Sequence, residues 1–352
     1  MCDHKDVSGY GLTQEMEEIM KQFNKLFCTA KVSASTGVLL LALMNTPAVQ
    51  AADQITFNMS WLPQGSMSGV ITAIEKGFYS DVDLEVEAVR GYGGVRTTGE
   101  IDQGLFEFGY GNPLAMVINH SKGGKTRIVG AINQHWPAGL CHVRERHKFD
   151  SPADLNGITI GGSGWSPVHV MVPVWLEMNG QSKDAVTLLK MDGAVVDASL
   201  VEGKIDAAEC WLGSNKALIE KLAKEAGLTI GFLNYSDFKL DILGSGIVTS
   251  DKVIAENPDK VRRFVTATFR GYEYANAHPE EATEYLLKQF PVLDPAVTLQ
   301  QVKETIDLTT AGGGKLGVID PAQVQRTIDF IGPAYEIDSV TAEELYTNEF
   351  LQ

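Results

Sequence analysis

Residues Ile55–Val89 read ITFNMSWLPQGSMSGVITAIEKGFYSDVDLEVEAV, and this stretch decides the fold. Its pattern predicts a short strand, a loop that carries Trp61, Pro63 and Gln64, a helix, and a second strand. In an open α/β sheet, ligands bind at the loops that leave the carboxyl ends of the strands. An aromatic ring and an amide in the first such loop therefore predict a small-molecule cleft.

The rest of the chain continues to alternate strands and helices, which is typical of α/β proteins with mainly parallel sheets. The expected elements are a helix near 95–103, strands at 106–110, 126–132 and 158–160, a helix from Pro113, a helical turn at Ser151-Pro152, a helix that starts at Pro167 with Ser166 as its cap, and two helices within 258–289 that are separated at His278. Ile101–Gly111 and Leu200–Leu212 share a layout of helix end, glycine, short strand and aromatic residue. This repetition predicts two similar lobes.

The composition is that of an acidic globular protein. The chain has 352 residues, 45 acidic against 29 basic, and a formal net charge of −16. At roughly 150 residues per domain, this length predicts about two domains. Because the negative field repels nucleic acid and anionic lipid, we expect neither as a partner.

Residues 20–51 have the pattern of an export signal. Three lysines precede an apolar run from Gly37 to Met44, and small residues precede a cleavage position after Ala51. A membrane span needs about 20 apolar residues, and this run is far shorter. We therefore expect a periplasmic protein. Residues 1–19 are expected to be a non-native extension, with the true start at Met20.

Cleavage leaves Cys141 and Cys210 of the four cysteines. We expect buried free thiols, but the sequence does not decide the pairing and a disulfide stays open. The histidines lack the spacing with glutamate that zinc hydrolases use. Near-matches to a phosphate-binding loop and to a nucleophile elbow fail at Asn119 and Trp165. We therefore expect no catalytic residue, no metal and no cofactor, and hence a protein that is not an enzyme.

Candidate binding residues gather where the expected strands end. Four of the five tryptophans follow such strands, namely Trp61, Trp136, Trp165 and Trp211. Flat rings there can stack on a planar ligand. The helix start at Ser166 offers N–H groups to an anion, although an ordinary cap explains this serine equally well. Glu209 and Asp241 favour an amine or a ring N–H donor in a cleft, or are merely solvated. No Arg or Lys is expected at a strand exit.

Several segments carry a family resemblance: SWLPQG with AIEKGFYSDVDLEVEAV, DQGLFEFGYGNPLA, SPADLNGITIGG, NPDKVRRFVTATFRGYEYANAHPEEA and the tail TAEELYTNEFL. In order and spacing they resemble the periplasmic substrate-binding proteins of the nitrate/sulfonate/taurine and thiamine-pyrimidine-precursor ABC importers. The resemblance implies a type II two-lobed binding-protein fold, each lobe a mixed, mainly parallel sheet flanked by helices. Lobe one would comprise 52–140 and 246–352 and lobe two 141–245, with crossings near 140–143 and 243–247.

By position, the resemblance implies a pocket that draws residues from both lobes. Those carried over are Trp61, Gln64, Tyr110, Asn112, Gln134 and Trp136, facing Ser163, Trp165, Ser166, Glu209 and Trp211; Asp241 is a further candidate. The implied function is that of the solute-binding component of an ABC importer, which clamps a small planar ligand by hinge closure. Its partners would be the permease and its ATPase, and we expect a monomer.

An N-heteroaromatic, pyrimidine-like ligand is favoured, because no basic residue is expected at the strand exits to meet a strong anion. The alternatives are a sulfonate, taurine or nitrate-type anion in the same role, a periplasmic pyrimidine-forming enzyme of the same fold, and a sensor module. The enzyme branch of the family has a cysteine-rich run of which only Cys210 remains here. This departure argues against the enzyme.

Overall fold

The computed structural model describes residues 51–164, 166–311, 313–337 and 339–351. The chain divides into two compact units, 1–51 and 52–352, and the fold described here is that of the second unit. Nearly all of the expected signal segment, the extension before it and Trp165 lie outside the described residues.

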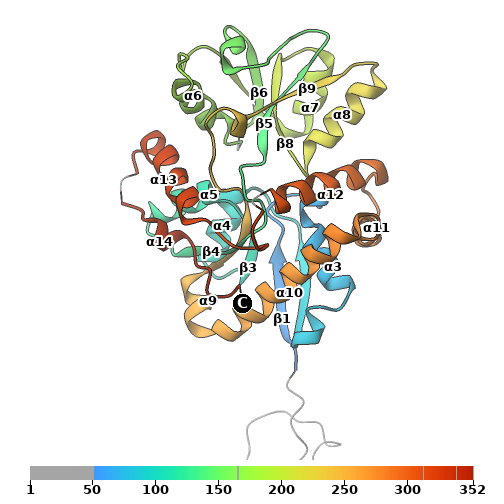
Figure 1. The fold of residues 1–352 in the computed structure, drawn as a ribbon, viewed down its shortest axis with the longest axis vertical. Helices are drawn as coiled ribbons and strands as arrows, with labels where there is room; N and C mark the ends of the chain where they lie inside the picture. Colours follow the sequence, from blue (N-terminus) through green and yellow to red (C-terminus); the bar gives the residue numbers. More distant parts are fainter. Residues whose placement is uncertain (1–50, 165, 312, 338, 352) are drawn as a thin grey trace, which may run out of the picture. The chain divides into compact units, whose positions relative to one another are not determined.

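The second unit contains two five-stranded sheets, which Figure 1 shows as the centres of two lobes. The strands are β1 (Asp53–Asn58), β2 (Leu84–Val89), β3 (Phe108–Gly111), β4 (Thr126–Ala131), β5 (Ala138–Val143), β6 (Thr159–Ser163), β7 (Thr187–Met191), β8 (Ala207–Trp211), β9 (Ile230–Asn234) and β10 (Gly246–Ser250). The strand orders are β2-β1-β3-β10-β4 in lobe one and β7-β6-β8-β5-β9 in lobe two.

Helices flank both sheets. They are α3 (Ser68–Glu75), α4 (Gly94–Asp102), α5 (Pro113–His120), α6 (Val168–Met178), α7 (Gly193–Glu202), α8 (Asn215–Glu225), α9 (Asp251–Glu256), α10 (Pro258–Ala277), α11 (Pro279–Gln289), α12 (Pro295–Thr310), α13 (Pro321–Tyr335) and α14 (Ala342–Leu345). Short 3₁₀ turns are η1 (Gly65–Met67), η2 (Ser80–Val82), η3 (Pro152–Leu155) and η4 (Tyr235–Asp237). None of the helices within the described residues is both long and apolar enough to cross a membrane.

The two lobes repeat one topology, which confirms the two-lobed fold with mixed sheets. β3 lies between parallel β1 and antiparallel β10, and β8 lies between parallel β6 and antiparallel β5. The helix before each central strand is followed by a glycine at a left-handed φ, 76° at Gly104 and 77° at Gly203. A residue with a Cβ is strained in that conformation, so glycine suits both helix ends.

The chain crosses between the sheets at 132–137 and at 240–245. The two crossings are hydrogen-bonded to each other: the N–H of Ile132 donates to Ser245 O at 2.8 Å, and that of Trp136 to Ile242 O at 3.0 Å. β5 belongs to the second sheet from Ala138 onward. The first crossing was expected near 140–143. It therefore lies a few residues earlier in the chain than expected.

The core of lobe one is built around aromatic side chains. Phe264 of α10 stacks on Phe108 of β3 at 4.1 Å between ring centroids and on Tyr79 at 5.3 Å. Beside them pack Phe57 of β1 and Val70 of α3, both fully buried. This packing explains the apolar positions at helical spacing along α10, and holds β1 and β3 so that their carboxyl ends face lobe two.

Each face of the second sheet has its own core. α6 covers one face, where Val168 and Trp175 pack with Leu140 and Leu233. α7 and α8 cover the other face, where Val196 and Ile219 pack with a disulfide between Cys141 and Cys210.

The expectation that these two cysteines are free thiols was wrong. The two cysteines lie diagonally across the antiparallel β5–β8 pair with 5.8 Å between Cα atoms, which is within bonding range.

Two helices of lobe one also contact lobe two. In α12, the Glu304 carboxylate accepts from the Nζ of Lys216 in α8 at 3.0 Å, and both side chains are largely buried. In α13, the Arg326 guanidinium pairs at 2.8 Å with Asp241, which lies within the second crossing. Charged side chains of lobe one thus pair both with α8 of lobe two and with the second crossing.

Candidate functional site

The carboxyl ends of β6 and β8 bring two of the expected site residues together in lobe two. The hydroxyl of Ser166 donates to one carboxylate oxygen of Glu209 and accepts from the N–H of Val168 at 3.2 Å. Pro167 directly precedes Val168, the first residue of α6, and already has helical dihedrals, φ −62° and ψ −16°. Ser166 accepts from the N–H of Val168, as a cap does, so the expected capping role is retained and also joins the first turn of α6 to a buried carboxyl group.

Glu209 is 6% exposed. Burial raises the pKa of its carboxyl from an ordinary 4.5 to about 7, and contacts with Ser166 and Trp211 partly offset that rise. Its second oxygen, Oε1, is buried and lacks a hydrogen-bond partner within the described part of the chain. Near neutral pH this group can therefore change its charge when a ligand arrives.

A pair of indole rings lies beside this carboxyl group. Trp136, just before β5, and Trp211, at the end of β8, have ring centroids 5.1 Å apart and tilted by 57°. Trp136 is 1% exposed, and its Nε1–H has no hydrogen-bond partner among the described residues. Trp211 is half-buried. The structure thus brings together two of the four tryptophans that were expected where strands end.

One amide holds the exit of β8 in place. The Oδ1 of Asn215 accepts from the N–H of Trp211 at 2.9 Å, and its Nδ2 donates to Glu209 O at 3.3 Å and to Asp197 Oδ1 at 3.0 Å. Burial raises the pKa of Asp197 to about 6, and its hydrogen bond with Asn215 partly offsets that rise. The backbone that carries Glu209 is therefore fixed from behind.

In lobe one, Tyr110 lies at the end of β3. Its hydroxyl accepts from Asn133 Nδ2 at 2.9 Å. Burial raises its pKa, while hydrogen bonds with Ser245, Asn133 and Ser66 partly offset that rise. The Oδ1 of Asn133 is buried without a partner in the described residues. Asn133 lies two residues after the end of β4, so a search for polar residues where strands end could have found it.

Three other expected residues of lobe one already have intramolecular roles. Asn112 caps α5, its Oδ1 accepting from Ala115 N at 3.0 Å. The Nε2 of Gln134 donates to Val318 O at 3.1 Å. The Oε1 of Gln64 accepts from the hydroxyl of Ser214 in lobe two at 2.6 Å. Whether any of them also contacts a ligand stays a prediction.

The first loop leaves Trp61 42% exposed. Its carbonyl accepts from Gly91 N at 3.1 Å, which places it beside the loop that follows β2. Arg90 directly follows β2, and its guanidinium lies 4.3 Å from the ring centroid of Tyr92. The expectation that no basic residue lies at a strand exit was therefore wrong.

Asp241 and Ser163 have local partners. Asp241 contacts His135 Nδ1 at 2.9 Å and Arg326 at 2.8 Å. Burial opposes ionisation of Asp241, but hydrogen bonds with Gln323 and His135 and the charge of Arg326 outweigh it and lower its pKa. The carbonyl of Ser163 accepts from His169 Nε2 at 3.0 Å. Asp241 thus belongs to an ion-paired group at the second crossing.

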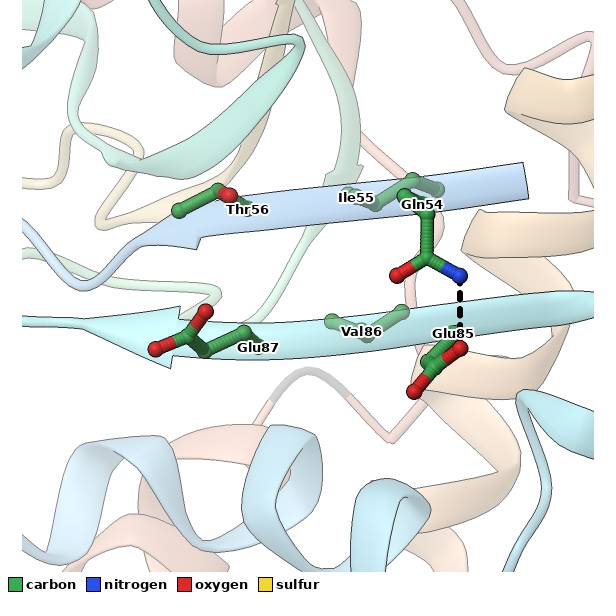
Figure 2. A pocket seen from close by; sticks show the side chains of 6 residues that line it. All are labelled: Gln54, Ile55, Thr56, Glu85, Val86 and Glu87. Atoms are coloured by element: carbon green, nitrogen blue, oxygen red, sulfur yellow. Dashed lines mark hydrogen bonds between the residues drawn. The ribbon is translucent and has the colours of Figure 1, made fainter. Parts of the chain in front are cut away.

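A surface hollow of about 320 Å³ lies elsewhere. Figure 2 shows its lining on β1 and β2, with Gln54 reaching across to Glu85 and Glu87 further along. It runs along the strands rather than at their carboxyl ends, and none of the expected site residues lines it. Within the described residues, no group of three or more His, Cys, Asp or Glu side chains could hold a metal ion.

Comparison with known proteins shows which proteins this chain resembles. A family described as NMT1/THI5 like matches residues 64–282. A protein of Brucella abortus described as a putative binding protein is 28% identical over 77% of this chain and 82% of its own length. The riboflavin-binding protein RibY of Chloroflexus aurantiacus is 24% identical over 92% of this chain and 93% of its own. A formylaminopyrimidine-binding protein of Halalkalibacterium halodurans is 25% identical over 73% and 77%.

Solved structures share the fold. The periplasmic aliphatic sulphonate-binding protein SsuA of Escherichia coli aligns with a TM-score of 0.66 and 14% identity, covering 85% of this chain and 99% of its own. The desulfurization enzyme DszB aligns with a TM-score of 0.58 and 18% identity, covering 85% and 97%. Binding proteins and an enzyme thus use one architecture, and the site must distinguish them.

Proposed function

Because the chain belongs to the NMT1/THI5-like family, we propose that it is an exported solute-binding component of an ABC importer. It binds a small planar N-heteroaromatic molecule between its lobes and delivers it to a permease and its ATPase. It acts as a monomer and releases the ligand unchanged. Hinge closure about the crossings at 132–137 and 240–245 brings the two sets of strand exits onto the ligand.

The observation that carries the ligand class is the carboxyl group of Glu209. It is buried, keeps one oxygen free of hydrogen bonds within the described residues, and lies beside the paired rings of Trp136 and Trp211. A ring N–H or amino group can donate to that oxygen, while the indoles supply stacking area.

The same carboxyl group disfavours an anion. The hydrogen bond with Ser166 holds the carboxyl group of Glu209 at the N-terminal end of α6. An oxyanion would otherwise find N–H donors at that end of the helix. A sulfonate at this position would face a second negative charge in a buried setting, which costs free energy. Arg90 directly follows β2, the edge strand of lobe one, and is exposed against Tyr92, so it does not offset Glu209. The named ligands of two relatives, riboflavin and formylaminopyrimidine, are planar nitrogen heterocycles and support the same class.

The experiment is a calorimetric titration with formylaminopyrimidine, riboflavin and taurine at several pH values. An N–H donor needs the ionised carboxylate as its acceptor. The dissociation constant should therefore fall by up to about tenfold per pH unit as pH rises toward 7, and level off above it. Glu209→Gln should remove this dependence, and Glu87→Gln, an exposed residue of β2, should retain it.

Other results would replace the proposal. Tight taurine binding that weakens as pH rises would assign the site to sulfonates. Conversion of a bound pyrimidine by the purified protein would indicate the pyrimidine-forming enzyme instead. A protein that binds its ligand but couples to a membrane receptor rather than a permease would be a sensor module.

A further inference from the structure

Tyr235 is a buried residue whose hydroxyl group is unpaired within the described part of the chain. It is the first residue of η4, directly after β9, and its side chain is 0% exposed. The hydroxyl has no hydrogen-bond partner within the described residues. Buried hydroxyls are almost always hydrogen-bonded, because leaving one unpaired forfeits its bond to water. An unpaired one therefore indicates a partner outside the described residues.

The register of the second sheet places Tyr235 on the face of Glu209. Leu140 of β5 lies opposite Glu209 on one side and opposite Leu233 on the other. Directly opposed residues share a face, and so do residues two apart along a strand. Trp211 and Tyr235, each two residues further along, extend that shared face to the carboxyl edge.

Contacts support this placement. The Tyr235 ring packs edge-on against Trp175 of α6 at 4.9 Å between centroids. α6 is also the helix whose first turn is joined to Glu209 by Ser166. Burial raises the pKa of the Tyr235 hydroxyl well above its ordinary value, and the negative charge of Glu209 adds to the rise.

Three buried polar atoms without partners thus lie at one edge of lobe two, and their chemistry is complementary to a single kind of ligand. Trp136 Nε1–H can only donate, the ionised Glu209 Oε1 can only accept, and the Tyr235 hydroxyl can do either. A ligand edge that carries a donor next to an acceptor, such as an amide or amidine edge of a nitrogen heterocycle, pairs with all three.

We propose that Tyr235 is a specificity-determining residue whose hydroxyl, with Trp136 Nε1 and Glu209 Oε1, binds the amide- or amidine-like edge of the ligand. This inference rests on the proposed function, because it concerns the same site. It adds a residue that directly follows β9, a strand that the family resemblance and the expected site did not use.

The test compares two tyrosine-to-phenylalanine variants. Tyr79 is equally buried, but its hydroxyl is paired with Thr268 at 2.7 Å in the core of lobe one. Tyr79→Phe should lower the melting temperature of the ligand-free protein and leave ligand affinity unchanged. Tyr235→Phe removes an unpaired hydroxyl, so it should leave that melting temperature unchanged or higher. It should also weaken the binding of formylaminopyrimidine or riboflavin about tenfold, which corresponds to about 1.4 kcal/mol.

The outcomes separate this inference from the proposed function. If Tyr235→Phe binds as tightly as the wild type, the hydroxyl does not contact the ligand and the inference is overturned. If neither heterocycle binds the wild type, the proposed ligand class fails, and the melting temperatures still decide about Tyr235. If Tyr235→Phe lowers the melting temperature of the ligand-free protein as much as Tyr79→Phe does, the Tyr235 hydroxyl has a partner inside the free protein and the inference is overturned. An unchanged or higher value supports a hydroxyl that is kept free for a ligand.

Discussion

Glu209 is a carboxyl group whose surroundings disfavour its charge, and this has a measurable effect on stability. The unfolded chain ionises near pH 4.5, whereas the folded protein keeps this group protonated until about pH 7. The free energy of unfolding therefore falls as pH rises through that window, by about 3 kcal/mol in all, and the loss is complete above pH 7. Glu209→Gln removes this contribution.

We expect the stability of Glu209→Gln relative to the wild type to be about 3 kcal/mol more favourable at pH 8 than at pH 4.5. Urea unfolding at the two pH values measures it. The matched control is Glu87→Gln, the same substitution at an exposed position, which should show no such difference. Equal pH dependence in both variants would contradict a carboxyl that is protonated in the folded state.

At the scale of single residues, the sequence predicted which side chains gather in lobe two better than it predicted the partners of each side chain. Trp136, Trp211, Ser166 and Glu209 were expected from their place after strands, and the structure brings these four together. Gln64 was expected in the pocket from the same rule, yet it bonds to Ser214 of the other lobe, a partner 150 residues away. Nothing local in the sequence indicates such a partner.

At the scale of elements, α4 offers a test in which two glycines respond in opposite directions. Gly99 lies within the helix, and a Cβ there would meet nothing within 4 Å. Gly99→Ala should raise the free energy of unfolding by about 0.5–1 kcal/mol, because alanine favours a helix. Gly104 has open space too, but a φ of 76°, so Gly104→Ala should lower it by about 1 kcal/mol. Chemical denaturation of both variants measures the two effects.

Each substitution is the control for the other, because the side-chain change is the same and both sites have room for a methyl group. Destabilisation by both would mean that space, not backbone conformation, decides at Gly99. Stabilisation by both would mean that the left-handed turn before β3 is not retained in solution.

Elements with strong local signals could be predicted, and those set by pairing could not. The strand–helix–strand start, the helix break at His278 and the paired glycines before β3 and β8 are confirmed. β3 begins at Phe108, two residues later than expected, because its limits are set by pairing with β1. No strand was expected at Ile230–Asn234, and Tyr235 was missed for that reason.

At the scale of the whole molecule, α12 and α8 hold the lobes together in this structure. Lys216 of α8 is enclosed by Glu304 of α12 at 3.0 Å and by Glu220 at 2.7 Å. Removing one partner from a buried ion pair costs up to about 3–5 kcal/mol, and less here because Glu220 still pairs with Lys216. Since Glu304 and Lys216 belong to different lobes, Glu304→Gln should favour separation of the lobes without unfolding either one.

Spin labels at Lys148→Cys in lobe two and Val292→Cys in lobe one would report this by the distance distribution of the ligand-free protein. Glu304→Gln should add or enlarge a population at a distance other than that of the wild type. The control is Lys303→Gln, one residue away, whose pair with Glu280 at 3.2 Å is exposed and lies within lobe one. Indistinguishable distributions for the two variants would exclude a role of the α8–α12 pair in lobe closure.

The disulfide between Cys141 and Cys210 has a consequence for which face of the sheet Glu209 and Trp211 occupy. Side chains alternate along β8, so Glu209 and Trp211 face α6 while Cys210 faces α7 and α8. A slip of β8 by one residue against β5 would exchange these faces and turn the carboxyl group away from its site. The bond between the strands blocks that slip. Under the proposed function, an oxidising compartment therefore does more than stabilise the chain, because the disulfide locks the alignment on which ligand recognition would depend.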